Sequence, residues 1–216
     1  MTHPTNIGKS ITEAIRFVSR LGGECERLTE VIKEELSRAL LTPEVARRYK
    51  AGGKWIDRRT TDEHDWVYTE LGISLPMISK PKRSTGSYLV VQISLAGVGV
   101  NAEDNDEPLL HLGRWGNSID FEEIQMGFPL DLDNEHDLVL EDERLFHWVH
   151  TQFESEWCYS VRLTDINSPN DVQNHIVNPI KALLLGSSAA QALSGTAAVR
   201  YARVEDKVGH YRTLPR

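Results

Sequence analysis

Acidic and lysine side chains occur together near the end of the sequence. Glu205, Asp206 and Lys207 are consecutive, so an acid stands two positions before a lysine. Metal-dependent nucleases use this spacing, because the acid holds Mg²⁺ or Mn²⁺ while the lysine steadies the attacking water or the developing charge. The spacing is also common by chance. A nuclease therefore needs further carboxylates nearby, for which one or more of three residues are available: Asp62, Asp65 and Glu70.

The stretch from Thr61 to Asp65 places an imidazole among carboxylates just before an apolar alternation. Asp62, His64 and Asp65 have side chains suited to general acid–base chemistry. An ordinary polar entry into a strand explains the same residues without any chemistry. The two interpretations differ in geometry, because an enzyme must gather these carboxylates and Glu205 in one cleft.

Two further patterns contain side chains that bind metals. Residues 131–137 have acidic or amide side chains at alternate positions, as a calcium loop does, but His136 stands where that loop has glycine. His147 and His150 share a face only if they lie on a helix, and the glutamate of a zinc-protease motif is absent. Neither a glycine-rich phosphate loop nor a nucleophile elbow occurs. We expect no metal and no cofactor, apart from Mg²⁺ or Mn²⁺ under the nuclease alternative.

Charge is distributed unevenly along the sequence. Residues 101–144, the acidic segment, contain 14 of the 32 acidic side chains against only Arg114 and Arg144, which leaves −12 here and +4 elsewhere. Its densest part contains Glu103, Asp104, Asp106 and Glu107. Because segregated charge steers association, the segment predicts a surface for a protein partner.

A basic cluster precedes the acidic segment. It consists of Arg47, Arg48, Lys50, Lys54, Arg58 and Arg59, with Tyr49 and Trp55 among them. Such a cluster can bind nucleic acid through phosphates and stacked bases. The formal charge of −8 makes that the less favoured interpretation, because nucleic-acid-binding domains are usually basic. The alternative is a surface that faces the acidic segment of the same chain or of a second copy.

The N-terminal forty residues predict a long amphipathic helix. Apolar or small residues recur at alternating spacings of three and four, at Ile11, Ala14, Val18, Leu21, Cys25, Leu28, Ile32 and Ala39. Ser10 and Glu13 match a capping box, which predicts the start of the helix, and Gly22-Gly23 lies inside it without changing its phase. The apolar face has two interpretations, packing on the protein's own sheet or pairing with a second copy.

Elements after this helix are predicted from shorter patterns. Thr42-Pro43 starts a second helix that ends at Gly52-Gly53. Alternation predicts strands over 66–75, from Tyr88 to Leu95, 109–115, around 128–132, over 138–140 or on towards Val149, over 157–163 and 198–204. Ser168-Pro169 starts a helix to about Leu185, in which Pro179 implies a kink.

These patterns indicate an α+β fold with an N-terminal long helical arm, a central antiparallel sheet and a C-terminal helix packed on the sheet. Residues 1–53 form the arm and short helix and 54–216 the α+β domain, as one compact unit. No apolar run is long enough to span a membrane, and the first residues do not resemble a signal peptide. We expect a cytoplasmic protein without membrane contact, with reduced Cys25 and Cys158.

The favoured function is that of a non-enzymatic protein-interaction module. In this interpretation Glu103, Asp104, Asp106 and Glu107 form an acidic surface, and Arg47, Arg48, Arg58 and Arg59 form a complementary one. The N-terminal helix provides self-association. The alternative is a metal-dependent nuclease or related hydrolase with the carboxylates and Lys207 named above.

Overall fold

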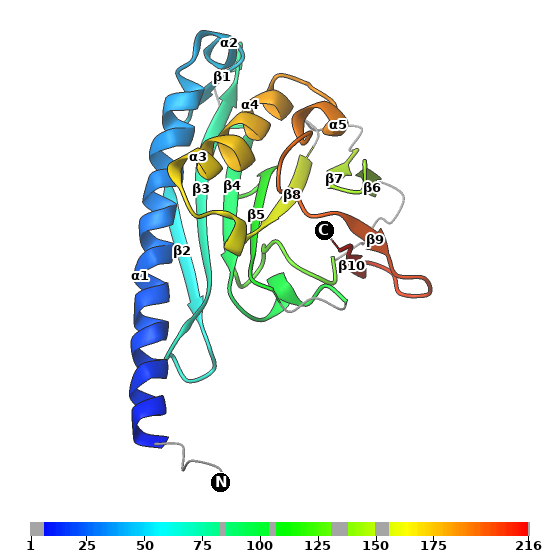
Figure 1. The fold of residues 1–216 in the computed structure, drawn as a ribbon. Helices are drawn as coiled ribbons and strands as arrows, with labels where there is room; N and C mark the ends of the chain where they lie inside the picture. The colour runs from blue at the N-terminus through cyan, green and yellow to red at the C-terminus, as the bar shows by residue number, and fades with distance from the viewer. Residues whose placement is uncertain (1–6, 83–84, 104–106, 131–137, 150–155, 216) are drawn as a thin grey trace.

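The computed structural model describes residues 7–82, 85–103, 107–130, 138–149 and 156–215, and it has the predicted α+β architecture (Figure 1). Eight antiparallel strands form one sheet in the order β1-β3-β4-β5-β8-β7-β6, and β2 pairs with β3 beside β1. Their bounds are β1 Tyr49–Ala51, β2 Ile56–Thr61, β3 Tyr68–Ser79, β4 Ser87–Ser94, β5 Leu109–Trp115, β6 Leu138–Glu141, β7 Leu145–Trp148 and β8 Glu156–Arg162. A separate hairpin consists of β9 (Tyr201–Arg203) and β10 (Tyr211–Thr213).

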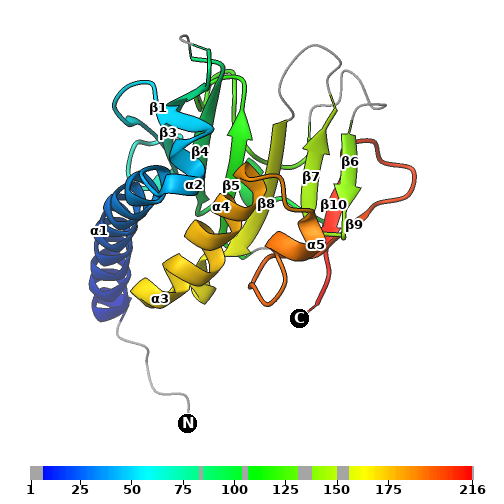
Figure 2. The same ribbon diagram turned by 90° about the horizontal axis from the view of Figure 1, so that it is seen from above.

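The α-helices lie on one face of the sheet, as the view from above shows (Figure 2). They are α1 Ile7–Leu40, α2 Pro43–Ala46, α3 Pro169–Val172, α4 Asn178–Leu184 and α5 Ala189–Ala192, with a π-helical turn, Gln173–Val177, between α3 and α4. Two 3₁₀ turns complete the described elements, η1 Val98–Val100 and η3 Leu163–Asp165.

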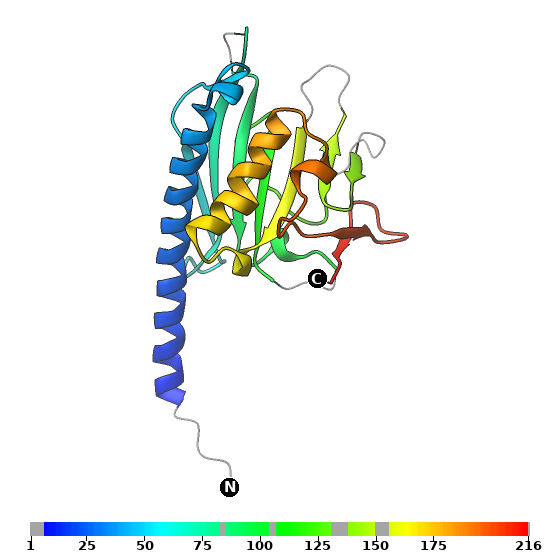
Figure 3. The same ribbon diagram turned by 45° about the horizontal axis from the view of Figure 1, so that its top comes forward.

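The first helix, α1, is continuous through Gly22-Gly23, as its unbroken apolar phase predicted. It begins at Ile7, so the predicted start at a capping box is wrong and Ser10 lies inside the first turns. The helix thus includes Ile7, which extends the apolar face one step further towards the N-terminus. Figure 3 shows the consequence, since this end of α1 runs well past the sheet.

The second helix starts as predicted, with Pro43 at its first position, but it ends at Ala46. The predicted continuation to Gly52-Gly53 is wrong, because Tyr49–Ala51 forms β1 and pairs with the end of β3. That end of β3 extends beyond the predicted strand, through Pro76, whose carbonyl oxygen accepts the Gly52 N–H at 2.7 Å.

The region between β5 and β8 differs from the prediction in two places. No strand forms at Phe128–Leu130, and the rest of that predicted strand lies outside the described residues. The strand predicted over 138–140 is confirmed as β6, and the alternative of one strand on towards Val149 is wrong, because β6 and β7 form a hairpin. Asp142 and Glu143 form the turn of this hairpin, both with positive φ (49° and 57°). Two acidic residues are not a typical sequence signal for such a turn, so it was not predicted.

The C-terminal helical run begins at the predicted cap, where the Ser168 hydroxyl accepts the Asp171 N–H. Pro179 has no N–H for the carbonyl four residues earlier, that of His175. The run accommodates this with the π-helical turn, and the buried Tyr159 hydroxyl donates to the His175 and Ile176 carbonyls at 3.0 and 3.3 Å. Tyr159 thus joins β8 to the helix.

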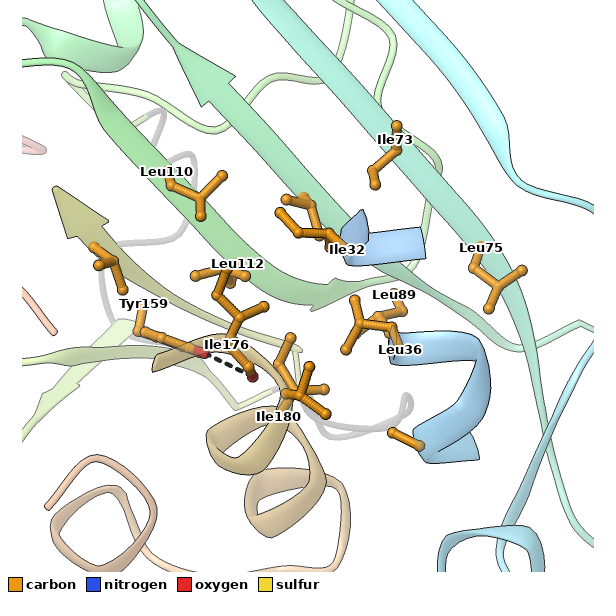
Figure 4. Close-up of a cluster of buried hydrophobic side chains, with 14 of the residues drawn as sticks. Ile32, Leu36, Ile73, Leu75, Leu89, Leu110, Leu112, Tyr159, Ile176 and Ile180 are labelled. Atoms are coloured by element: carbon orange, nitrogen blue, oxygen red, sulfur yellow. Dashed lines mark hydrogen bonds between the residues drawn. The ribbon is translucent and has the colours of Figure 1, made fainter. Parts of the chain in front are cut away.

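The main core lies between these helices and the sheet (Figure 4). Ile32 and Leu36 of α1 and Ile176 and Ile180 of the C-terminal run are fully buried or nearly so. They pack against Ile73, Leu75, Leu89, Leu110, Leu112 and Tyr159 of the sheet. The C-terminal half of α1 is therefore part of the same core as the strands.

Candidate functional site

The N-terminal part of α1 carries a large uncovered apolar surface. We call residues 7–20 the arm, and every one of them is exposed. Ile7 is 71% exposed, Ile11 56%, Ile15 62%, Phe17 65% and Val18 39%. Together with Ala14, these side chains form what we call the stripe, with Phe17 at its margin. Exposed apolar side chains gathered on one helix face are unusual in a monomeric protein.

The stripe is in phase with the packed half of α1. Ile7, Ile11, Ala14, Val18 and Leu21 continue into Cys25, Leu28 and Ile32 with the same spacing of three and four, and Cys25 and Ile32 are buried in the core. The stripe therefore points to the side of α1 on which the sheet lies. Charged side chains occupy the other side of the arm, at Lys9, Glu13, Arg16 and Arg20.

A pocket of about 600 Å³ lies where the arm meets the body of the molecule. Its lining comes from α1, the β2–β3 turn and the end of β4: Val18, Ser19, Leu21, Gly22, Gly23, Glu26, Thr61, Asp65, Trp66, Val67, Tyr68, Leu95 and Ala96. Trp66 is 83% exposed, the most exposed large apolar side chain in the described residues. The stripe and the pocket are adjacent, since Val18 belongs to both.

Asp62 and Asp65, two of the candidate catalytic residues, shape the turn that carries Trp66. The Asp62 carboxylate accepts the N–H groups of Trp66 and Val67 at 2.7 and 2.9 Å. Hydrogen bonds from the Val67 and Trp66 N–H groups lower the pKa of Asp62. Asp65 has a positive φ of 59°, and its carboxylate accepts the Thr61 hydroxyl at 2.6 Å. Both carboxylates thus have a structural role in the turn.

Glu70, the third candidate carboxylate, is buried in β3. Its Oε1 accepts hydrogen bonds from Gln92 Nε2 at 3.0 Å and from Ser94 Oγ at 3.3 Å. Burial raises the pKa of Glu70, because a charged carboxylate is poorly solvated there. This side chain belongs to a polar network inside the molecule and lies apart from the Trp66 turn.

Glu205 and Lys207 lie in the β9–β10 turn, on the opposite side of the molecule from α1 and β2 (Figures 1 and 2). Lys207 Nζ contacts Glu103 Oε1 at 2.5 Å, and the ion pair lowers the pKa of Glu103. Within the part of the chain that the structure describes, no three His, Cys, Asp or Glu side chains are grouped to hold a metal ion. The sequence-predicted carboxylates are thus not brought together.

The structure also contains a buried polar pair, His111 and Ser160, that the sequence did not indicate. His111 Nε2 lies 2.9 Å from the Gly99 carbonyl oxygen, so Nε2 carries the proton, and Nδ1 accepts the Ser160 hydroxyl at 2.8 Å. Burial lowers the pKa of His111 to about 4. Residues 111 and 160 are paired in register on β5 and β8. Only that register, which the sequence does not reveal, brings them together.

Described carboxylates of the acidic segment pair with cations of the same chain. Besides the Glu103–Lys207 pair, Glu107 contacts Arg162 at 2.5 Å and Glu143 binds Arg200. The charge segregation along the sequence is therefore partly neutralised in space by residues after 160. Asp104, Asp106, the calcium-like residues 131–137 and His150 lie outside the described residues.

The basic cluster divides into two places. Arg47 and Arg48 follow α2, and the Arg48 guanidinium donates a hydrogen bond to the Leu185 carbonyl oxygen at 2.8 Å. Arg58 and Arg59 lie in β2, where Arg59 donates to the Tyr68 hydroxyl at 2.7 Å and its guanidinium stands 5.5 Å from the centre of the Tyr68 ring. In the described contacts, these arginines bind to groups other than the acidic segment.

Comparisons with known proteins add no relative: no family model, curated protein or solved structure matches the chain. Among the helices that the structure describes, none is both long and apolar enough to cross a membrane.

Proposed function

We propose that this protein is a non-enzymatic interaction module that self-associates through the arm, with a second copy of the chain as the occupant of the stripe. The exposed stripe is the observation that carries this proposal. Burying large aliphatic side chains stabilises an association by about 1.5–3 kcal/mol for each side chain that becomes fully covered. The acidic segment plays no part in the proposal, because Glu103, Glu107 and Glu143 of this segment already contact cations of the same chain.

Charge placement favours a second copy as the partner. The positions beside the stripe, Gly8, Ser10 and Gly22, are uncharged, whereas Lys9, Arg16 and Arg20 lie on the far side of the helix. Two stripes can therefore face each other without bringing like charges into contact. Because both copies use the same surface, the interface is isologous and closes at two chains.

Two adjacent substitutions test the proposal with the same new side chain. Ile11→Asp puts a carboxylate in the stripe, and Thr12→Asp puts one on the polar side of the arm. Both positions are exposed in the isolated chain, so neither substitution affects folding much. Sedimentation equilibrium is expected to give a dimer for the wild type and Thr12→Asp, and a monomer for Ile11→Asp.

Three results contradict the proposal. The first is a wild-type mass that stays at one chain at every concentration. The second is equal weakening by both substitutions, which would indicate a general charge effect. The third is a monomeric wild type that binds lipid vesicles or a different protein through the arm, which would give the stripe another occupant.

A further inference from the structure

The direction of the stripe restricts how a second copy can approach. The sheet and the stripe lie on the same side of α1, because the apolar residues keep one phase from Ile7 to Ile32. A helix laid on the stripe therefore meets the body of the molecule at the base of the arm, where Leu21 and Gly22 line the pocket. Figures 1 and 3 show the β2–β3 turn at this place.

A parallel pair of arms is excluded by overlap. In a parallel pair both bodies stand at the same end, each on the side that faces the other helix, so the two bodies require the same space. In an antiparallel pair each body stands beyond the tip of the other arm. This arrangement brings Ile7 of one copy next to Val18 to Leu21 of the other, about 16–21 Å along the helix at 1.5 Å per residue.

The pocket begins at the place where that tip arrives. Val18, Ser19 and Leu21 form its wall on α1, and Gly22-Gly23 leaves space, since a Cβ at Gly23 would meet nothing within 4 Å. Tyr68, Leu95 and Ala96 supply an apolar floor from the body. A pocket of about 600 Å³ is large enough for an aliphatic side chain such as that of Ile7.

The two contacts are related by symmetry, because each copy offers one tip and one pocket.

We infer that the pocket is a receptor site for the arm tip of a second copy, with Ile7 as the inserted side chain and Trp66 packed over it. The inference rests on the proposed self-association and adds its orientation and its second contact. The pocket contact adds to the packing along the stripe and gives the interface an aromatic anchor, the kind of residue that dominates binding energy.

Cysteine cross-linking between separately prepared variants tests the orientation. Ile7→Cys protein is mixed with Ala96→Cys protein and treated with a short bismaleimide. Val208→Cys, exposed in the β9–β10 turn far from the arm, is the matched control. The native thiols interfere little, because burial raises the pKa of Cys25 to about 11 and that of Cys158 to about 12.

The inference predicts a covalent dimer from the mixture with Ala96→Cys, and none from Ile7→Cys alone or from its mixture with Val208→Cys. A covalent dimer from Ile7→Cys alone would indicate parallel arms and overturn the inference while leaving self-association intact. A wild-type protein that is monomeric in sedimentation would overturn the proposed function and this inference together.

A binding measurement gives a second readout that does not depend on cross-linking. Trp66→Ser is expected to raise the dimer dissociation constant about tenfold or more, because it removes the anchor. Val208→Ser, which replaces another exposed apolar side chain, is expected to leave the constant unchanged. Equal constants for the wild type and Trp66→Ser would show that the pocket is empty in the dimer and would contradict the inference.

Discussion

The two halves of α1 have the same sequence pattern and different surroundings. From Cys25 to Leu40 the apolar face is buried against the sheet and the C-terminal helices, whereas from Ile7 to Val18 the same face is exposed. The pattern thus specifies which face of a helix is apolar, and it does not specify what covers that face. Whether the apolar face of α1 is buried depends on how far the sheet extends beside the helix.

Element lengths explain the difference. With 34 residues α1 is about 51 Å long at 1.5 Å per residue, whereas the longest strand, β3, with 12 residues, spans about 40 Å. A helix aligned at one end of this sheet must extend past the other. This excess of about 11 Å forms the outer part of the arm, which contacts a second copy in the proposed dimer.

The largest expected effect is a difference in the free energy of unfolding between substitutions in the two halves of α1. Ile32→Ala should lower the free energy of unfolding by about 2–5 kcal/mol, because it opens a cavity in the core. Ile11→Ala should change it by less than about 0.5 kcal/mol when the protein is dilute enough to be monomeric. Urea unfolding followed by circular dichroism measures both. Equal losses would mean that the arm is packed in the isolated chain, and the comparison would fail.

A smaller effect is expected at the junction of the halves. Asp62→Ala removes the acceptor of the Trp66 and Val67 N–H groups, so the turn should no longer hold Trp66 over the pocket. We expect a several-fold weaker dimer with a small fall in melting temperature. Glu63→Ala, in the same turn, is the control and should leave the dimer unchanged. If the two variants dissociate equally, the shape of the turn does not matter for association.

Local patterns were sufficient to predict much of the fold. The phase of α1, the Thr42-Pro43 helix start, the strand over 109–115 and the Ser168 cap depend on neighbouring residues, and the structure contains all of them. The predicted end of the second helix was wrong, because β1 forms through contact with the distant end of β3.

The candidate site was less accessible from sequence because it depends on contacts between distant residues. Asp62 and Asp65 have the composition of an acid–base site, and their oxygen atoms are used instead to close a turn. Glu70 stands in β3 where both faces of the strand are buried, which spacing alone did not reveal. The stripe was visible as a pattern, but its exposure follows from the relative lengths of α1 and the sheet.

Hydrogen exchange along α1 tests the central claim most directly, because it reports both halves of the helix in one experiment. Amide exchange is followed by mass spectrometry at protein concentrations below and above the dimer dissociation constant. The account predicts that the amides of residues 11–20 exchange more slowly as the concentration rises, while those of residues 28–40 are protected throughout. Rapid exchange of residues 11–20 that is the same at every concentration would contradict it.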